Sequence, residues 1–459
     1  MRKIAHALFS IFWKPEADQQ LAIVSEYYDH YNQIDQLLQT MPGVLKLIHD
    51  DLAALSKATV KEREADFTSE NLFRALVLMQ CEGWTLRETT IRIADSNFFQ
   101  NFCRLLKKKT IDYTLLCHAF NAIRPETWEL VNQAFGLQMK QEGKIDTDNI
   151  RTDTTVTECN IHYPTDSSLL WDVYRVTERL VSQAREAGTV MMAMRFHLKK
   201  IKKLHLDVTR FSNSKSEKRK RWVKNQLKSL IHRVGETVVK VKSIRLELSQ
   251  SLDPGVQGIG AELCRLLPIM ERIVDVARRN SHGETVPVTE KVFSLFEEHT
   301  ELIKRGRREK PVEFGHKVLF SETKEKFITD YVVFEQSPSD TTLLPMVMER
   351  HEEIFGAKMK NLAADMGFRP EEGDFEELEE EVEYLAVPKR LRDLSDATLR
   401  MYQCFRAGIE GTISCLKRAY RLSRCHFRGF KGFCRSVGSA VFCHNLSSMV
   451  ALARKEVQT

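Results

Sequence analysis

The sequence predicts a mostly helical α/β protein in which one mixed sheet is assembled from segments far apart in the chain. Residues 148–163, DNIRTDTTVTECNIHY, are rich in Thr, Val and Ile and alternate as a strand does. Residues 316–336, HKVLFSETKEKFITDYVVFEQ, contain two β-rich runs around a polar turn, which predicts a hairpin. Long amphipathic segments fill most of the remaining chain, so helices are expected to outweigh strands.

The segments after the hairpin complete the predicted sheet. A helix is expected in 342–359, a short strand in 360–368, and an apolar strand in 384–390 that follows the acidic stretch 371–383. The chain then ends in helices. With the helical block 165–310 set aside, the order is strand, hairpin, helix, strand, strand, helix, which fits a mixed sheet carrying one antiparallel hairpin.

Residues 1–145 predict a domain of short amphipathic helices. Thr85 and Glu88 have capping-box spacing, which predicts a helix beginning at Leu86. Short helices joined by tight turns resemble a helix-turn-helix DNA reader. A basic junction, Lys107, Lys108 and Lys109, adds to that resemblance. An ordinary helical bundle is the alternative.

The charge is mildly basic and unevenly distributed. The 459 residues carry a formal net charge of +6, and the segment from Lys199 to Arg245 alone holds sixteen Lys or Arg residues against three acids. Local charge this far above the chain average predicts contacts with phosphate groups. A solvated basic helix is the alternative.

The composition predicts a globular cytoplasmic protein. Hydrophobic residues make up 42% and charged residues 29%, which argues against disorder. The ten cysteines include no CxxC pair, a pattern typical of free thiols in a reducing compartment. The N-terminus does not resemble a signal peptide, and no uninterrupted apolar run approaches about 20 residues, so no membrane span is expected.

Three acids occupy positions from which they can meet at one edge of such a sheet. Asp153 lies in the first strand, Asp365 ends the strand NLAAD just before a glycine, and Glu410 lies on a late helix. Carboxylates at neighbouring strand ends, with one from a flanking helix, are what a two-metal phosphoryl-transfer site requires. Asp146 and Asp148, which precede the first strand, are rivals of Asp153.

The helix FRAGIEGTISCLKRAY (405–420) carries its charges on one stripe. At about 100° per residue, Arg406, Glu410 and Lys417 lie within a narrow sector beside an apolar stripe. A row of two cations with a carboxylate between them suits contacts along a polyanion. The alternative is an amphipathic helix with an exposed Arg–Glu ion pair, worth a few tenths of a kcal/mol.

These motifs, taken in order, resemble the DDE transposases of bacterial insertion sequences. Four stretches carry the resemblance: DTTVTECNIHYPTDSSLLWD for the first acid, LAADMGF for the second, FRAGIEGTISCLKR for the third, and FCHNL in the C-terminal helix. The third stretch has the Arg-x3-Glu-x6-Lys spacing of the family signature. The family usually has a tyrosine three positions before the arginine, and Gln403 takes that place here.

The resemblance implies an RNase H-like mixed sheet core with a helical N-terminal DNA-binding domain (1–145). The core would be split (146–164 and 311–450) by a basic helical insertion (165–310) that follows the first core strand. It further implies Mg2+, or Mn2+ in its place, held by Asp153, Asp365 and Glu410. The activity implied is cleavage of element ends and joining of the 3′-hydroxyl to target DNA by two-metal phosphoryl transfer.

The implied partner is double-stranded DNA, both the terminal repeats and the target, bound by a homodimer or higher oligomer in the nucleoid. The expected DNA-binding residues are Arg406, Lys417, Arg87, Arg92, Lys107, Lys108, Lys109, Lys218, Arg219, Lys220 and Arg221. Two alternatives remain: a structure-specific nuclease on the same core, and a catalytically inactive DNA-binding derivative.

Overall fold

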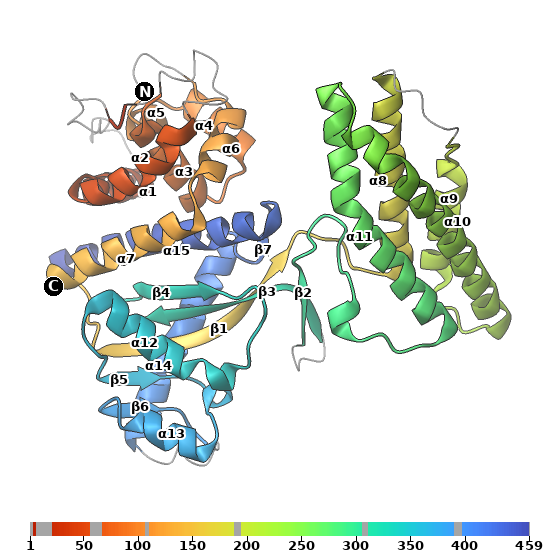
Figure 1. Ribbon diagram of the computed structural model, residues 1–459. Helices are drawn as coiled ribbons and strands as arrows, with labels where there is room; N and C mark the ends of the chain where they lie inside the picture. Colours follow the sequence, from red (N-terminus) through yellow and green to blue (C-terminus); the bar gives the residue numbers. More distant parts are fainter. Residues whose placement is uncertain are drawn as a thin grey trace. The chain divides into compact units, whose positions relative to one another are not determined.

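The chain folds into two compact units. The computed structural model describes residues 3–5, 21–55, 67–105, 110–187, 194–304, 311–389 and 397–458. The first unit comprises Met1–Cys159 and Gly315–Thr459, and the second comprises Asn160–Phe314. Most described residues are helical, and the strands form one mixed sheet (Figure 1). The predicted class, a mostly helical α/β protein, is therefore confirmed.

The sheet is centred on β1. Its path runs β2-β3-β1-β5-β6, with β4 paired to β3 and β7 paired to β1. β1 is antiparallel to β3 and parallel to β5, which is parallel to β6. The strand bounds are β1 Asn149–Cys159, β2 Glu301–Lys304, β3 Val312–Glu322, β4 Ile328–Val333, β5 Asn361–Ala363, β6 Tyr384–Ala386 and β7 Arg424–Cys425.

The predicted order of elements after β1 is confirmed. β3 and β4 form the hairpin, α12 (Leu344–Phe355) follows, and β5 and β6 lie in the two stretches expected to be strands. One helix was not expected: the acidic stretch folds as α13 (Glu372–Glu379). Its Phe375 and Leu378 are buried in the core while the acids face solvent. Acids in its first turn also suit the positive end of the helix dipole.

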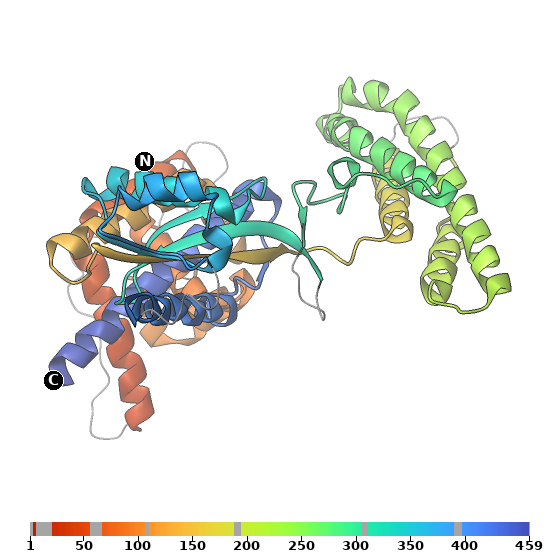
Figure 2. The same ribbon diagram turned by 90° about the horizontal axis from the view of Figure 1, so that it is seen from below.

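Helices cover both faces of the sheet (Figure 2). On one face, Ile150 and Leu362 join an apolar core with residues of α12 and α13. On the other face lies α14 (Ala397–Arg418), which packs mainly on β1 (Figure 1). Because side chains alternate along a strand, Arg151 and Asp153 point away from Ile150, towards the α14 face.

The N-terminal helices pack into the same unit as the sheet. They are α1 Ala22–Thr40, α2 Pro42–Leu55, α3 Ser69–Cys81, α4 Leu86–Asp95, α5 Asn97–Phe102, α6 Tyr113–Ala122 and α7 Pro125–Gln141. α4 begins at Leu86 as predicted, since the Thr85 side chain accepts the Glu88 N–H. Buried Asp35 binds two buried arginines, Arg74 and Arg104, at 2.6 and 2.7 Å.

The C-terminal helix α15 (Gly429–Gln458) joins the N-terminal helices to the sheet. It packs against α7, α3 and β4. At Gly438 an added Cβ would lie 2.4 Å from the Tyr331 hydroxyl and 2.6 Å from Trp128 Cβ, so only glycine permits this close approach. The FCHNL stretch supplies Asn445, whose amide binds both the N–H and the carbonyl of Ile328 at the start of β4.

The second unit is a helical bundle with its own core. Its helices are α8 Asp166–Glu186, α9 Leu198–Phe211, α10 Glu217–Ser249 and α11 Pro254–His282. The most extensive packing is between α10 and α11, and one apolar cluster unites all four helices. The unit spans Asn160–Phe314, and the sequence placed the helical insertion at 165–310. Beyond the long helices it also contains β2, which the sequence did not indicate.

One described helix, α15, is long and apolar enough to cross a membrane. In its most apolar window 72% of the residues are buried inside the structure. Core helices of soluble proteins meet the same criterion of length and composition.

Candidate active site

The parallel pairing of β1 with β5 brings Asp153 and Asp365 to the same level of the sheet. In that register Arg151 is opposite Ala363, and Asp153 and Asp365 each lie two residues C-terminal to this pair. Asp365 follows the end of β5 and caps a short 3-10 turn, η6 (Met366–Phe368), by accepting the Gly367 N–H at 2.8 Å. The two acids therefore occupy neighbouring positions, with Asp365 just after the end of β5 and Asp153 in the middle of β1.

A buried polar network fixes α14 over β1. Arg151 Nε donates to Glu322 on β3 at 2.9 Å, and its Nη1 donates to the Phe405 carbonyl of α14 at 2.8 Å. The Thr412 hydroxyl, further along α14, donates to the other oxygen of Glu322. Burial raises the pKa of Glu322, an effect that the Arg151 charge opposes. These hydrogen bonds fix the distance of α14 from β1, and thereby the position of Glu410 on that helix.

Gly408 is the position at which α14 admits the Arg151 guanidinium. A Cβ added there would lie 2.0 Å from Arg151 Nη1. Arg151 has no room to withdraw, because its side chain is only 6% exposed and is held by Glu322. Glycine at 408 is therefore required for the helix to sit at this distance from β1.

Gln403 ties α14 to the strand ends that carry Asp365. Its Nε2 donates to the carbonyls of Ala364 and Ala386 at 3.0 and 2.9 Å. These carbonyls lie directly after β5 and at the end of β6. The family pattern has a tyrosine at this position. Here it is occupied by Gln403, whose side chain donates hydrogen bonds to the backbone. Sequence reasoning noticed the departure but did not find this role.

Arg406 and the three acids form one electrostatic group. Arg406 Nη2 lies 2.9 Å from Glu410 Oε1, and its Nη1 lies 3.9 Å from Asp153 Oδ2. The pKa of Asp153 is raised from 3.8 to about 6, first by burial and then by the charges of Asp365 and Glu410. The Thr154 N–H and the Arg406 charge act in the opposite direction. Asp365 and Glu410 thus both lie close enough to Asp153 to shift its pKa.

The three carboxylates do not form a compact cluster of ligand atoms. All three residues are described, and their oxygens are not all within 4.8 Å of one another. Asp153 is 17% exposed and Glu410 is 61% exposed, so the Glu410 side chain has freedom to rotate inward. A cation bound by Asp153, Asp365 and Glu410 together would require their carboxylates to move closer to one another.

The rival acids do not join this group. Asp146 and Asp148 precede β1, where Asp146 accepts the Asp148 N–H and binds Lys324 at 3.3 Å. Asp148 pairs with Lys360 at 2.6 Å. Both carboxylates are thereby engaged by lysines at the start of the strand, before the level of Asp153.

The predicted DNA-binding residues are distributed over both units. Arg406 and half-buried Lys417 lie on α14, while Arg87 and Arg92 are exposed on α4. Lys107, Lys108 and Lys109 lie outside the described residues. Lys218, Arg219, Lys220 and Arg221 are exposed in the first turns of α10, in the second unit. Arg87 and Arg92 are five residues apart, about 140° around the helix, so they do not form one stripe.

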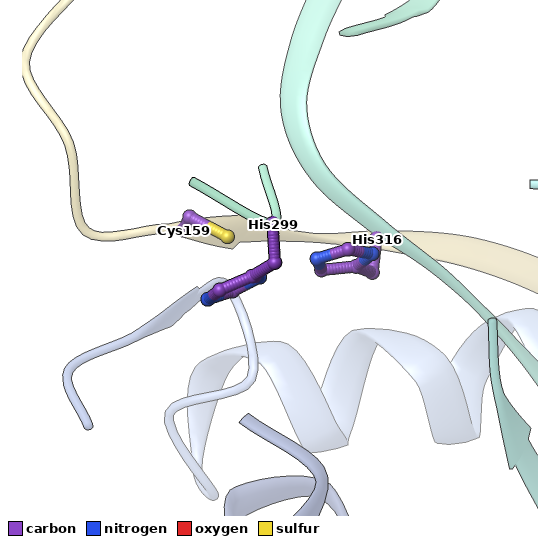
Figure 3. Close-up of side chains that lie close together, drawn as sticks. All are labelled: Cys159, His299 and His316. Carbon is purple, nitrogen blue, oxygen red and sulfur yellow. The ribbon is translucent and has the colours of Figure 1, made fainter. Parts of the chain in front are cut away.

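Two further potential metal ligands occur in the first unit where β1 meets β3. They are Cys159, which ends β1, and His316, on β3, and Figure 3 labels both together with His299. The His316 Nδ1 bonds with the Phe334 carbonyl at 2.9 Å. His299 belongs to the second unit, where it pairs with Glu297 at 2.8 Å. A metal site is not inferred across the two units.

Comparisons with known proteins add no identification. No family model, no curated protein and no solved structure matches the chain.

Proposed function

We propose that the chain is a DDE-type DNA transposase with an RNase H-like catalytic core, acting on DNA in the cytoplasm as a homodimer or higher oligomer. One observation carries the proposal. Asp153, Asp365 and Glu410 are separated by 212 and 45 positions in the sequence, yet the charges of Asp365 and Glu410 both raise the pKa of Asp153, and Arg406 lies between Asp153 and Glu410. A mixed sheet with one antiparallel hairpin is the kind of core that the sequence motifs imply.

The donor set suits Mg2+ or Mn2+. Three carboxylates supply the oxygen ligands that such hard ions prefer. The pKa of Asp153 is raised first by burial and then by the charges of Asp365 and Glu410, so a cation bound beside these acids would favour the ionised form of Asp153. A divalent ion would supply an activated water or hydroxyl and would offset charge on the leaving oxygen.

The remaining residues would position the reacting groups. Arg406 bridges Asp153 and Glu410, so it can exchange a carboxylate for a DNA phosphate when ions enter. Arg151 and Gln403 hold α14 against β1, β5 and β6, and thereby keep Glu410 opposite the two aspartates. Lys417, seven residues from Glu410, would contact phosphate as a point charge.

The test is cleavage of a plasmid that carries the DNA flanking the coding sequence. With Mg2+ or Mn2+, the wild-type protein is expected to nick or excise at the element ends and to join them to a second plasmid. Asp365→Asn and Glu410→Gln should abolish cleavage while DNA binding is kept. The exposed α13 acids provide matched controls, Asp374→Asn and Glu376→Gln. Cleavage that survives either site variant would exclude the proposal, and cleavage without joining would indicate a nuclease.

A further inference from the structure

A second site is formed by a cavity of about 770 Å³ in the first unit. Its walls come from the end of α3, the turn to α4 and the start of α4, from α6, from α15, and from the segment 421–428 that joins α14 to α15. None of the three acids of the candidate active site lines it. A cavity of this size lies in the range of small-molecule and cofactor sites.

The lining is strongly cationic. Arg87, Arg421, Arg424 and Arg428 all contribute to it, and no Asp or Glu is among its lining residues. Arg424 is paired with Glu158 at 2.7 Å, which leaves the other three arginines to set the charge of the cavity. The pKa of His426 is lowered by burial and then by Arg421 and Arg424. An anionic ligand is therefore favoured, and arginine forks suit phosphate in particular.

The same cavity presents flat aromatic surfaces. Tyr113 is 41% exposed, and the Arg87 guanidinium lies 4.7 Å from its ring centroid. Trp84 and Phe427 also line the cavity, and Phe427 is held in place by stacking on Phe120 with centroids 4.0 Å apart. Aromatic rings and guanidinium planes are both surfaces on which a nucleobase stacks.

We propose that this cavity binds one unpaired nucleotide, with its base against Tyr113 and its phosphate between Arg421 and Arg428. Aromatic rings and phosphate-binding arginine forks at one place match the base and the phosphate of that ligand. The nucleotide could come from a DNA strand or from the free pool, since both present the same chemistry. The site goes beyond the proposed cleavage reaction, because none of its residues is an acid of the active site.

The test uses the full-length protein in the presence of a chelator, so that no cleavage occurs. The probe is a short single-stranded oligonucleotide with an internal 2-aminopurine, whose fluorescence falls when the base stacks. Tyr113→Ala should weaken binding by about 5-fold or more, whereas Tyr113→Phe, which keeps the ring, should not. Arg428→Ala should also weaken binding, and Arg265→Ala, an exposed arginine of the second unit, should not.

Competitors distinguish the two sources of the nucleotide. Displacement of the oligonucleotide by deoxyadenosine monophosphate assigns the cavity to free nucleotides, and binding of the oligonucleotide alone assigns it to a DNA strand. The proposal is overturned if Tyr113→Ala and Arg428→Ala both bind like the wild type. The proposal is also overturned if inorganic phosphate displaces the oligonucleotide at the same concentration as deoxyadenosine monophosphate does, since the base would then contribute nothing to binding. Because these readouts do not involve cleavage, they succeed or fail independently of the transposase assay.

Discussion

Replacing Asp153 by asparagine should stabilise the protein at neutral pH when divalent ions are absent. The raised pKa, from 3.8 to about 6, corresponds to roughly 3 kcal/mol of unfavourable free energy for the ionised carboxylate in the folded state. The Asp153 side chain is 17% exposed, so solvent screens this energy only in part. The asparagine side chain would keep an oxygen for the Thr154 N–H and would remove the charge that Asp365 and Glu410 repel.

The sign of the pH dependence follows from the direction of the shift. The folded state binds the Asp153 proton more tightly than the unfolded state does, so the free energy of unfolding falls as pH rises from about 4 to about 6. Asp153→Asn should therefore raise the free energy of unfolding by up to roughly 3 kcal/mol at pH 8 and by little at pH 4. For a unit of this size, that is about 5 °C in melting temperature.

The assay is thermal unfolding at both pH values in a chelating buffer, and then with Mg2+ added. Mg2+ should raise the melting temperature of the wild type more than that of Asp153→Asn, because the variant lacks one ligand. Glu376→Gln, on an exposed position beyond the first turn of α13, is the control and should change neither the melting temperature nor its response to Mg2+. A variant no more stable than the wild type at pH 8, or an equal response of both to Mg2+, would refute the reasoning.

Three other perturbations test the framework of the site. Gly408→Ala should lower the free energy of unfolding by about 2 kcal/mol or more, because the new Cβ displaces Arg151 from its buried partners. Asp35→Ala should cost about 3–5 kcal/mol by removing the buried carboxylate that Arg74 and Arg104 share. Neutral substitutions at Lys218–Arg221 should reduce the slope of log affinity for DNA against log salt by about 0.9 for each phosphate that is no longer neutralised.

Each of these three predictions has a control variant or an outcome that would contradict it. Gly411→Ala lies on the same helix with open space around its Cβ, so it should stabilise by up to about 1 kcal/mol. Equal behaviour of the two alanine variants in denaturant titration would show that Arg151 does not require Gly408. Asp50→Ala, on an exposed face of α2, should have little effect. A salt slope that does not change would remove the α10 basic cluster from the DNA contacts.

The elements were predictable from the sequence wherever one residue pattern decided them. β1, the β3–β4 hairpin and the start of α4 follow from alternation, a polar turn and a capping residue. Asp153 and Asp365 were found because each stands on or just after a strand. α13 was missed because only two apolar residues, Phe375 and Leu378, anchor an otherwise acidic stretch.

The supporting residues were not predictable, because they depend on how the strands and α14 are aligned. Arg151 and Glu322 are partners only because β1 pairs with β3 in one particular register. Gln403 became interpretable only when the ends of β5 and β6 were seen beside it. The cationic cavity brings together α4, α6 and residues 421–428, and no local pattern indicates that they meet.

Anomalous X-ray diffraction from crystals soaked in Mn2+ would examine most directly whether these acids form a metal site. The result we expect is anomalous density ligated by carboxylate oxygens of Asp153, Asp365 and Glu410, and lost in crystals of Asp153→Asn. Anomalous density located only elsewhere, or unchanged by that substitution, would contradict the assignment.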